Sequence, residues 1–184
     1  MGKFITIKKL EKGNFFKGEV PIFIQEFGKR ASVEKVFGFA RAAGKENWQA
    51  WLLAQPEYLP WLLRNGADVN IAEGLALKLA AQEGHYSSVK ALIGKGIKRT
   101  FIGEALVEAA ERGWHSVVDL LLKNGVNPCV LDCLAIKGAA FNGHQAIVRT
   151  LADNGSEQIK EAISKASMGG YPEIAWMLKK DYSG

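Results

Sequence analysis

The residue types best suited to chemistry lie in the second half of the chain. Cys129 and Cys133 are the only cysteines, four residues apart, and His144 follows them. A helix would place both sulfur atoms on one face, where cysteine and histidine side chains could bind zinc. Such a site would still need a fourth ligand, and a paired Cys-x-x-Cys motif is missing. We therefore expect reduced, largely buried cysteines and no metal.

The histidines and glycines also lack the surroundings that catalysis requires. No histidine has a nucleophile evident beside it in the sequence, although triad residues need not be adjacent. The glycines form neither of the two common phosphate-binding patterns, Gly-x-Gly-x-x-Gly and Gly-x-x-x-x-Gly-Lys-Ser/Thr. The sequence thus predicts no catalytic residue and no cofactor. A small hydrolase or metal enzyme that uses Cys129, Cys133 and His144 is the minor alternative.

The glycines instead mark a repeated phrase, in which two small residues and a glycine precede an apolar stretch that ends in a second glycine. The first glycines of three copies, Gly84, Gly113 and Gly143, lie 29 and 30 residues apart. A fixed period in this range is typical of a solenoid of helical hairpins. Weaker copies at 50–66 and 166–180 make five in all, and atypical ends are expected of such an array. The three clear copies are AAQEGHYSSVKALIGKG (80–96), AAERGWHSVVDLLLKNG (109–125) and AAFNGHQAIVRTLADNG (139–155).

Each copy predicts two short antiparallel helices. Around Gly113, an alanine-rich stripe at helical spacing precedes the glycine, and a stretch of valines and leucines follows it. Alanines let two helix axes approach closely, and glycine ends a helix in a left-handed conformation without steric cost. Helices this short are not stable alone, so stacking between neighbouring copies must hold the array together.

From about Trp48 to Lys180, these phrases resemble the ankyrin repeat. The clearest matches are Gly84-His85, Gly143-His144 and the run NGADVN at 65–70. The family's Thr-Pro-Leu-His opening is replaced by LALK, EALV, LAIK and EAIS, and the period is shorter than the usual length of about 33 residues. The resemblance implies an all-α, ankyrin-like helical-hairpin solenoid with blunted or uneven β-hairpins. It also implies that His85 and His144 are structural and bond to the backbone of adjoining loops.

The resemblance further implies where a partner protein would bind. In ankyrin-type stacks the partner usually lies on the concave side, against the hairpin tips and the ends of the first helices. Phe141 is the most informative residue there, because a large ring at a usually solvated position needs a partner or a cover. The implied partner-binding residues are Gln82, Glu83, Glu111, Arg112, Trp114, Phe141 and Asn142, and the hairpin positions Asp68, Asn70, Ile97, Lys98, Arg99 and Phe101 would extend this surface.

Residues 1–45 differ from the repeats in charge. They hold ten Lys or Arg against four Glu, a balance of +6, whereas the rest of the chain has 14 basic and 15 acidic residues, a balance of −1. Such an arm suits an acidic protein surface, nucleic acid or an anionic membrane, or is simply a solvated face. Nucleic-acid binding through this arm is therefore the alternative function.

The same arm is predicted to contain a small β-structure. Phe4, Ile5 and Ile7 indicate a strand, Gly13-Asn14 indicates a turn, and the β-prone stretch at 15–27 would complete a hairpin. Ser32 is expected to cap a helix from Val33 to about Ala43. The arm is either a lid on the first repeat or a separate contact module. Trp48, Trp51 and Trp61 are expected to seal its junction with the repeats.

Together these patterns predict a basic arm at 1–45 and five ankyrin-like repeats at 46–184. The expected function is a non-catalytic protein–protein interaction module, an adaptor or an inhibitor. By general resemblance, short divergent arrays also suit microbial or viral proteins that inhibit a host defence enzyme. The chain has no apolar run of membrane-spanning length and no secretory signal at its N-terminus, so we expect a cytoplasmic protein without a membrane partner.

Overall fold

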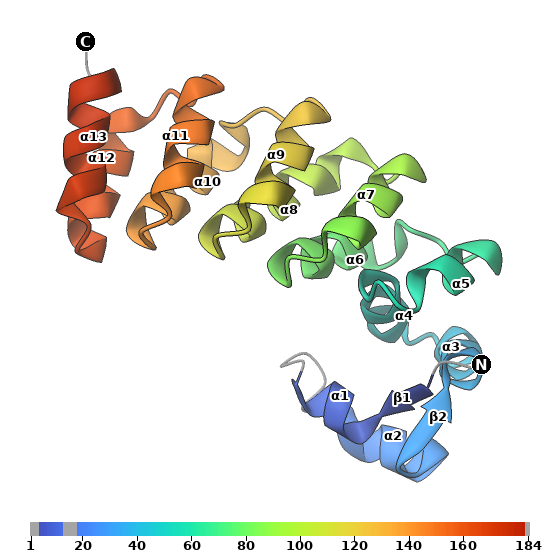
Figure 1. Ribbon diagram of the computed structural model, residues 1–184. Coiled ribbons are helices and arrows are strands. Elements are labelled where there is room, and N and C mark those ends of the chain that lie inside the picture. Colours follow the sequence, from blue (N-terminus) through green and yellow to red (C-terminus); the bar gives the residue numbers. More distant parts are fainter. Residues whose placement is uncertain (1–3, 13–17, 183–184) are drawn as a thin grey trace.

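The computed structural model describes residues 4–12 and 18–182, and helices dominate it (Figure 1). Five helix pairs follow one another along the chain, which confirms the predicted all-α solenoid with a small β-containing arm. The arm consists of β1 (Phe4–Thr6), α1 (Ile7–Lys12), α2 (Val20–Phe27), β2 (Arg30–Ser32) and α3 (Val33–Ala42). The pairs are α4 (Glu46–Ala54) with α5 (Leu59–Arg64), α6 (Ile71–Gln82) with α7 (Tyr86–Gly94), α8 (Arg99–Glu111) with α9 (His115–Lys123), α10 (Val130–Phe141) with α11 (Gln145–Asp153), and α12 (Ile159–Gly169) with α13 (Pro172–Tyr182).

The first helices of the pairs form an inner row, and the second helices form an outer row. Along the inner row α4, α6, α8, α10 and α12 pack extensively, each on the next, whereas neighbouring outer helices touch much less. Fully buried alanines such as Ala80, Ala109 and Ala139 lie in the inner row and let its helix axes approach closely. Because the inner helices are closer together than the outer ones, the inner side of the array is concave.

The β-hairpins that the resemblance implies are missing, since residues 46–182 contain no strand. In two connections a left-handed turn takes their place. Residues Ala72–Gly74 have φ between 50 and 75°, and Leu131–Cys133 have φ between 51 and 58°. These two connections, Gly66 to Gly84 and Gly125 to Gly143, are each one residue longer than the connection from Gly96 to Gly113. The left-handed turn therefore accommodates the extra residue.

The expected N-terminal hairpin is wrong in its second strand. Residues Val20–Phe27 form helix α2, and β1 pairs instead with β2 in antiparallel register, Ile5 opposite Ala31. Val20, Phe23 and Phe27 recur at helical spacing, and Pro21 occupies the first turn, where its missing N–H costs nothing. The expected Gly13-Asn14 turn lies outside the described residues.

The expected helix after the arm's second strand is confirmed. Helix α3 begins after Ser32, whose Oγ accepts a hydrogen bond from the Lys35 amide at 3.4 Å. This bond satisfies one of the amides that every helix leaves unpaired at its start. The cap fixes the direction of α3 as the chain leaves the small sheet.

Aromatic rings join the arm to the first helix pair. Trp48 lies 6.2 Å from Phe23 and 5.8 Å from Phe39, between ring centroids. The Trp61 ring meets Phe37 edge-on at 6.1 Å. Trp48 and Trp51 are each only 3% exposed, so the expectation that tryptophans seal this junction is confirmed. The arm thus covers the apolar end of the array.

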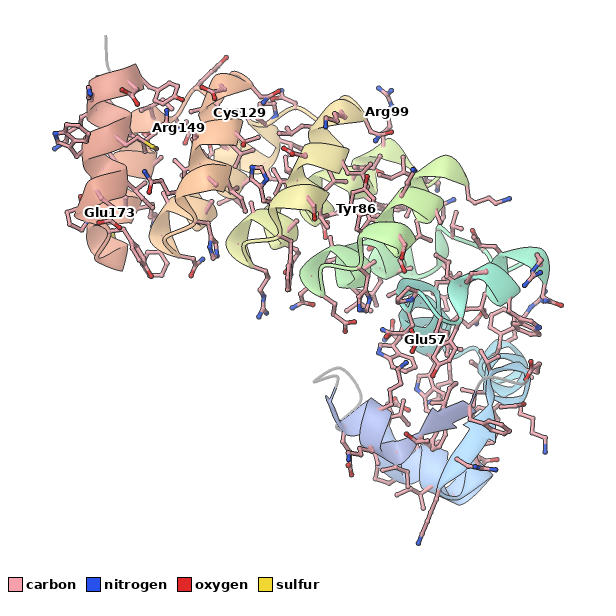
Figure 2. The ribbon with its side chains drawn as sticks, viewed as in Figure 1. Glu57, Tyr86, Arg99, Cys129, Arg149 and Glu173 are labelled. Atoms are coloured by element: carbon pink, nitrogen blue, oxygen red, sulfur yellow. A yellow bond between two sulfur atoms is a disulfide. The ribbon has the colours of Figure 1, made fainter. Side chains whose placement is uncertain are left out.

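Polar contacts fix the same junction. The Tyr58 hydroxyl donates to the Phe4 carbonyl at 3.1 Å. This bond joins the residue that precedes α5 to strand β1. Lys9 forms an ion pair with Glu57, labelled in Figure 2, and its Nζ lies 4.5 Å from the centre of the Tyr58 ring. Tyr58 is 1% exposed, so its hydroxyl has little access to water as an alternative partner.

The junction predicts a stability loss at alkaline pH. Burial raises the pKa of Tyr58 to about 12, above the ordinary value of 10.0. The neutral phenol therefore contributes fully below pH 10, and its contribution is lost as the pH rises toward 12. Tyr58→Phe should lower the free energy of unfolding at pH 7 by about 1 kcal/mol, for one hydrogen bond. It should also flatten the alkaline decline. Urea unfolding followed by tryptophan fluorescence measures both effects, with the exposed Tyr86→Phe as control, and an unchanged alkaline decline in Tyr58→Phe would contradict this assignment.

Candidate protein-binding surface

In the three central pairs, α6–α7, α8–α9 and α10–α11, an aromatic side chain follows the glycine between the two helices and bonds to the preceding pair. His85 Nδ1 donates to the Ala54 carbonyl at 3.1 Å, and Trp114 Nε1 donates to the Gln82 carbonyl at 2.9 Å. His144 Nε2 likewise donates to the Glu111 carbonyl at 3.0 Å. The structural role that the resemblance implies for His85 and His144 is thus confirmed. Trp114 performs the same task with a different ring.

Two of these rings, and the Tyr171 ring of the last pair, also lie against the glycine of the preceding pair. The Trp114 ring covers Gly84, the His144 ring covers Gly113, and the next residue of this series, Tyr171, covers Gly143. A Cβ at any of these glycines would collide with the ring. The glycines have φ of 71, 82 and 79°, so both the backbone and the neighbouring ring require glycine.

The ring positions predict a stability difference between two substitutions of Trp114. Trp114→His should hold the free energy of unfolding within about 1 kcal/mol of the wild type, because histidine makes the same bond in the neighbouring repeats. Trp114→Ala should cost about 2 kcal/mol, from one hydrogen bond and a half-buried ring. Chemical unfolding of both variants tests this, and a Trp114→Ala variant as stable as the wild type would show that the ring does not support the stack.

The inner helices present equivalent strips of side chains to the concave side. Each strip consists of the residues nine, five and two positions before the glycine between the helices, a spacing that keeps them on one helix face. The strip of α8 is wholly acidic, that of α10 is apolar, and that of α12 is mixed. The strips are Leu75, Leu79 and Gln82 on α6, Glu104, Glu108 and Glu111 on α8, Leu134, Gly138 and Phe141 on α10, and Glu161, Lys165 and Met168 on α12.

A hollow of about 410 Å³ lies over the strip of α10. Leu134 and Phe141 stand two turns apart at its ends, and the Glu111 side chain of α8 lies against Gly138 between them. Leu134 is 44% exposed and Phe141 is 45% exposed, high values for large apolar side chains. Glu111 of α8 borders one side of the hollow and Lys165 of α12 borders the other. The hollow can therefore receive an apolar group between two opposite charges.

The structure brings together three of the seven residues predicted to bind a partner. Glu111, Phe141 and Asn142 all line the hollow. Trp114 is 42% exposed but lies against Gly84, and Arg112 is exposed in the turn after α8.

The other predicted positions serve contacts within the protein. Glu83 Oε2 accepts a hydrogen bond from Gln55 Nε2 at 3.2 Å, and the Gln82 carbonyl is bound by Trp114. Among the hairpin positions, Asn70 Oδ1 accepts from the Lys98 amide at 2.8 Å. These residues therefore join neighbouring repeats, and nothing in their contacts marks a partner site.

Sequence reasoning missed four lining residues: Leu134, Lys137, Gly138 and Lys165. The first of them carried a usable signal, because Leu134 and Phe141 are seven residues apart and so share a helix face. Lys165 belongs to the next repeat, and only the stacking of α12 on α10 brings it to the hollow.

Ion pairs hold Lys137 at the hollow and two acids of the neighbouring α8 strip. Lys137 Nζ lies 2.8 Å from Asp132 Oδ2 and donates to Gln158 Oε1 at 3.0 Å. The hydrogen bonds from Lys137 and from Gln158 hold the pKa of Asp132 below its usual value. Lys78 Nζ lies 3.2 Å from Glu104 and 3.6 Å from Glu108, and the hydrogen bond with Glu104 raises the pKa of Lys78. Two acids of the α8 strip therefore share one cation from α6.

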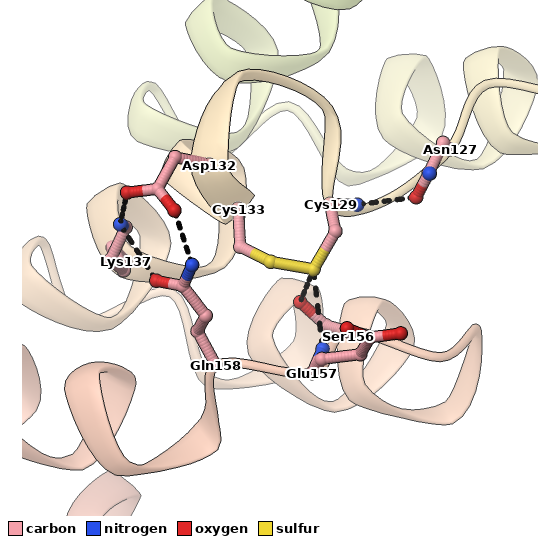
Figure 3. The surroundings of a disulfide bond; sticks show 8 residues. All are labelled: Asn127, Cys129, Asp132, Cys133, Lys137, Ser156, Glu157 and Gln158. Carbon is pink, nitrogen blue, oxygen red and sulfur yellow. Dashed lines mark hydrogen bonds and ion pairs between the residues drawn. A yellow bond between two sulfur atoms is a disulfide. The ribbon is translucent and has the colours of Figure 1, made fainter.

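The cysteines form a disulfide, which corrects the expectation that they are reduced (Figure 3). A right-handed helix over 129–133 was assumed, but the left-handed turn at Leu131–Cys133 brings the two sulfur atoms together. Cys129 Sγ also accepts a hydrogen bond from the Glu157 amide at 3.2 Å, which ties α10 to the next repeat. Since His144 bonds to the Glu111 carbonyl, the residues considered for zinc are not assembled as ligands. Disulfides persist chiefly in oxidising compartments, and the cytoplasmic location stays a prediction.

The left-handed turn predicts unequal effects of cysteine replacement. Opening a closed loop of five residues should lower the free energy of unfolding by about 2 kcal/mol. The equivalent of Cys133 in the α6 turn is Gly74, with φ of 75°, so glycine suits this backbone better than serine. Chemical unfolding should therefore show Cys129→Ser with Cys133→Gly to be more stable than Cys129→Ser with Cys133→Ser. Equal stabilities would contradict a left-handed conformation at this position.

The helix pairs are stacked, and a ring of one repeat lies on the glycine of the preceding repeat. This arrangement defines a helical-repeat protein. Residues 77–162 match the family model described as "Ankyrin repeats (3 copies)". These residues are thus ankyrin repeats, and the resemblance drawn from the sequence is confirmed there. No curated protein matches the chain. Among the described helices, none has the length and apolar character needed to cross a membrane. Ankyrin repeats are in general non-catalytic modules for protein–protein interaction.

Proposed function

We propose that this protein binds a partner protein with its concave face and that the hollow over α10 is the centre of the contact. The observation that carries the proposal is the exposure of Leu134 and Phe141 on either side of Gly138. Equivalent positions on α8 hold Glu104 and Glu111, which water solvates well. An exposed apolar strip has no such solvation, and exposed apolar patches are typical of interaction sites.

The proposed mode of action is that of an adaptor or an inhibitor. The described surface of the concave side offers an apolar hollow between charged rims, and the His144 and Trp114 rings of the same two repeats are bound to backbone carbonyls. A module of this kind acts by occupying, blocking or bridging the partner that it holds. The inhibition of a host defence enzyme is one form of that action.

The basic arm is a weaker candidate for the binding site than the concave face of the repeats. Lys9 pairs with Glu57, and Lys45 Nζ lies 3.1 Å from Glu19. The Arg30 guanidinium lies 4.6 Å from the centre of the Phe4 ring. Because these basic residues already contact the protein itself, we base the proposed function on the repeats and not on nucleic-acid binding.

A capture experiment tests the proposal. The full chain is immobilised and used to capture a partner from extracts of its source cells. Phe141→Gln should reduce the captured partner at least about tenfold, because a central apolar anchor is replaced by a solvated amide. Its midpoint of thermal unfolding should stay within about 2 °C of the wild type, since the ring is half exposed.

Tyr86→Gln is the matched control for this experiment. Tyr86 is 43% exposed, close to the 45% of Phe141, but it lies on the outer helix α7, as Figure 2 shows. This variant should capture as much partner as the wild type. Equal capture by Phe141→Gln and the wild type would place the binding site elsewhere.

A further inference from the structure

The two rims of the hollow carry opposite charges that are not used inside the protein. Glu111 and Lys165 are both exposed and line the hollow from α8 and α12. Within residues 4–12 and 18–182, neither takes part in an ion pair, whereas Glu104 and Glu108 on the same face both pair with Lys78. Lys137, the other cation at the hollow, is held by Asp132. The charges left for a partner are therefore one negative rim and one positive rim.

The apolar floor separates these rims in a fixed order. The strip of α10, with Leu134 and Phe141, lies between α8 and α12 because the inner helices stack in sequence order. Met168 is 67% exposed and occupies the position in α12 that Phe141 occupies in α10. Gly169 packs against the backbone of Phe141, so α12 lies directly beside the end of α10. At the hollow the surface thus passes from the acidic Glu111 of α8, over the apolar strip of α10, to the basic Lys165 of α12.

The spacing of the helices sets the spacing of the groups that would complement them. Axes of packed helices lie about 8–10 Å apart, and an extended chain advances about 3.3 Å per residue. A segment that crosses the inner helices therefore advances about three residues from one strip to the next.

We propose that the partner presents a charge-ordered extended segment to this face. A basic side chain lies opposite Glu111, an apolar side chain enters the hollow beside Phe141, and an acidic side chain lies opposite Lys165. The proposal rests on the proposed function and names the partner chemistry that it requires. A polyanion such as nucleic acid is disfavoured, because the acidic strip of α8 would repel it.

The three contacts have different tasks. The apolar side chain supplies most of the affinity, because it covers a surface that is otherwise exposed to water. The two charges are solvent-exposed and contribute little affinity, but a like charge in either place is rejected. Substitutions at the rims should therefore change which segments bind more than how tightly the best one binds.

Selection of peptides from a random library displayed on phage tests this proposal. The full chain is the bait, in the wild-type form and as Glu111→Lys, Lys165→Glu and Phe141→Gln. Wild-type selection should enrich an apolar residue with a basic residue on one side and an acidic residue on the other, each about three positions away. Glu111→Lys should enrich acidic residues on both sides, and Lys165→Glu should enrich basic residues on both sides.

This design is independent of the direction in which a peptide crosses the helices. A peptide can bind in either direction, so exchanging the two rim charges would not change the selected sequences, whereas making both rims alike must change them. Glu111→Gln and Lys165→Gln are milder versions that should each remove one charge preference. Circular dichroism and thermal unfolding verify that each bait is folded.

The outcomes separate the two proposals. Charge patterns that stay the same in Glu111→Lys and Lys165→Glu would overturn the charge-ordered segment, while enrichment that requires Phe141 would still uphold binding at the hollow. Enrichment that is indifferent to Phe141→Gln, or no enrichment on the wild type, would contradict the proposed function itself. Self-association that Phe141→Gln abolishes in sedimentation would identify a second copy as the occupant and would also overturn the inference.

Discussion

The array depends on one repeated contact, in which an aromatic ring lies over a glycine of the preceding helix pair and bonds to a backbone carbonyl there. Trp114 over Gly84 and His144 over Gly113 are two instances. The contact demands a glycine for two reasons, a positive φ and the lack of space for a Cβ. It also fixes the separation of successive pairs, and hence the regular spacing of these glycines in the sequence. No helix here is long enough to be stable alone, so these contacts and the buried alanines of the inner row hold the fold together.

The ring contacts and the buried alanines of the inner row stabilise the stacking of the repeats. The exposed strips of the inner helices can therefore differ from repeat to repeat. The strip of α8 carries three glutamates, while that of α10 carries Leu134, Gly138 and Phe141 at the equivalent positions. The fold tolerates both, since the one position among them that the ring contact uses, Glu111, takes part through its backbone carbonyl. Variation of this kind is how one scaffold supports many binding specificities, and it is why the proposed function comes from the surface and not from the fold.

The sequence alone was sufficient for features that depend on neighbours along the chain. The glycine spacing predicted the helix pairs, and Ser32 predicted the start of α3. It was insufficient where the outcome depends on contacts between distant segments. The aromatic stretch at 20–27 fits a strand by composition, but helix α2 buries Phe23 against Trp48 of the first pair. Likewise, the disulfide requires a left-handed turn that four-residue spacing cannot reveal. Phe141 could be singled out as unusual, yet its companion Lys165 comes from another repeat.

The central claim, that a partner binds over the α10 strip, is tested most directly by photo-crosslinking at position 141. Phe141 would be replaced by a photoreactive phenylalanine analogue in the full chain, which is then irradiated in its source cells, with the same analogue at Tyr86 as the reference. The two positions are almost equally exposed, on opposite rows of the array. The account predicts one dominant crosslinked protein from position 141 that is not obtained from position 86. The same products from both positions, or none from position 141, would contradict it.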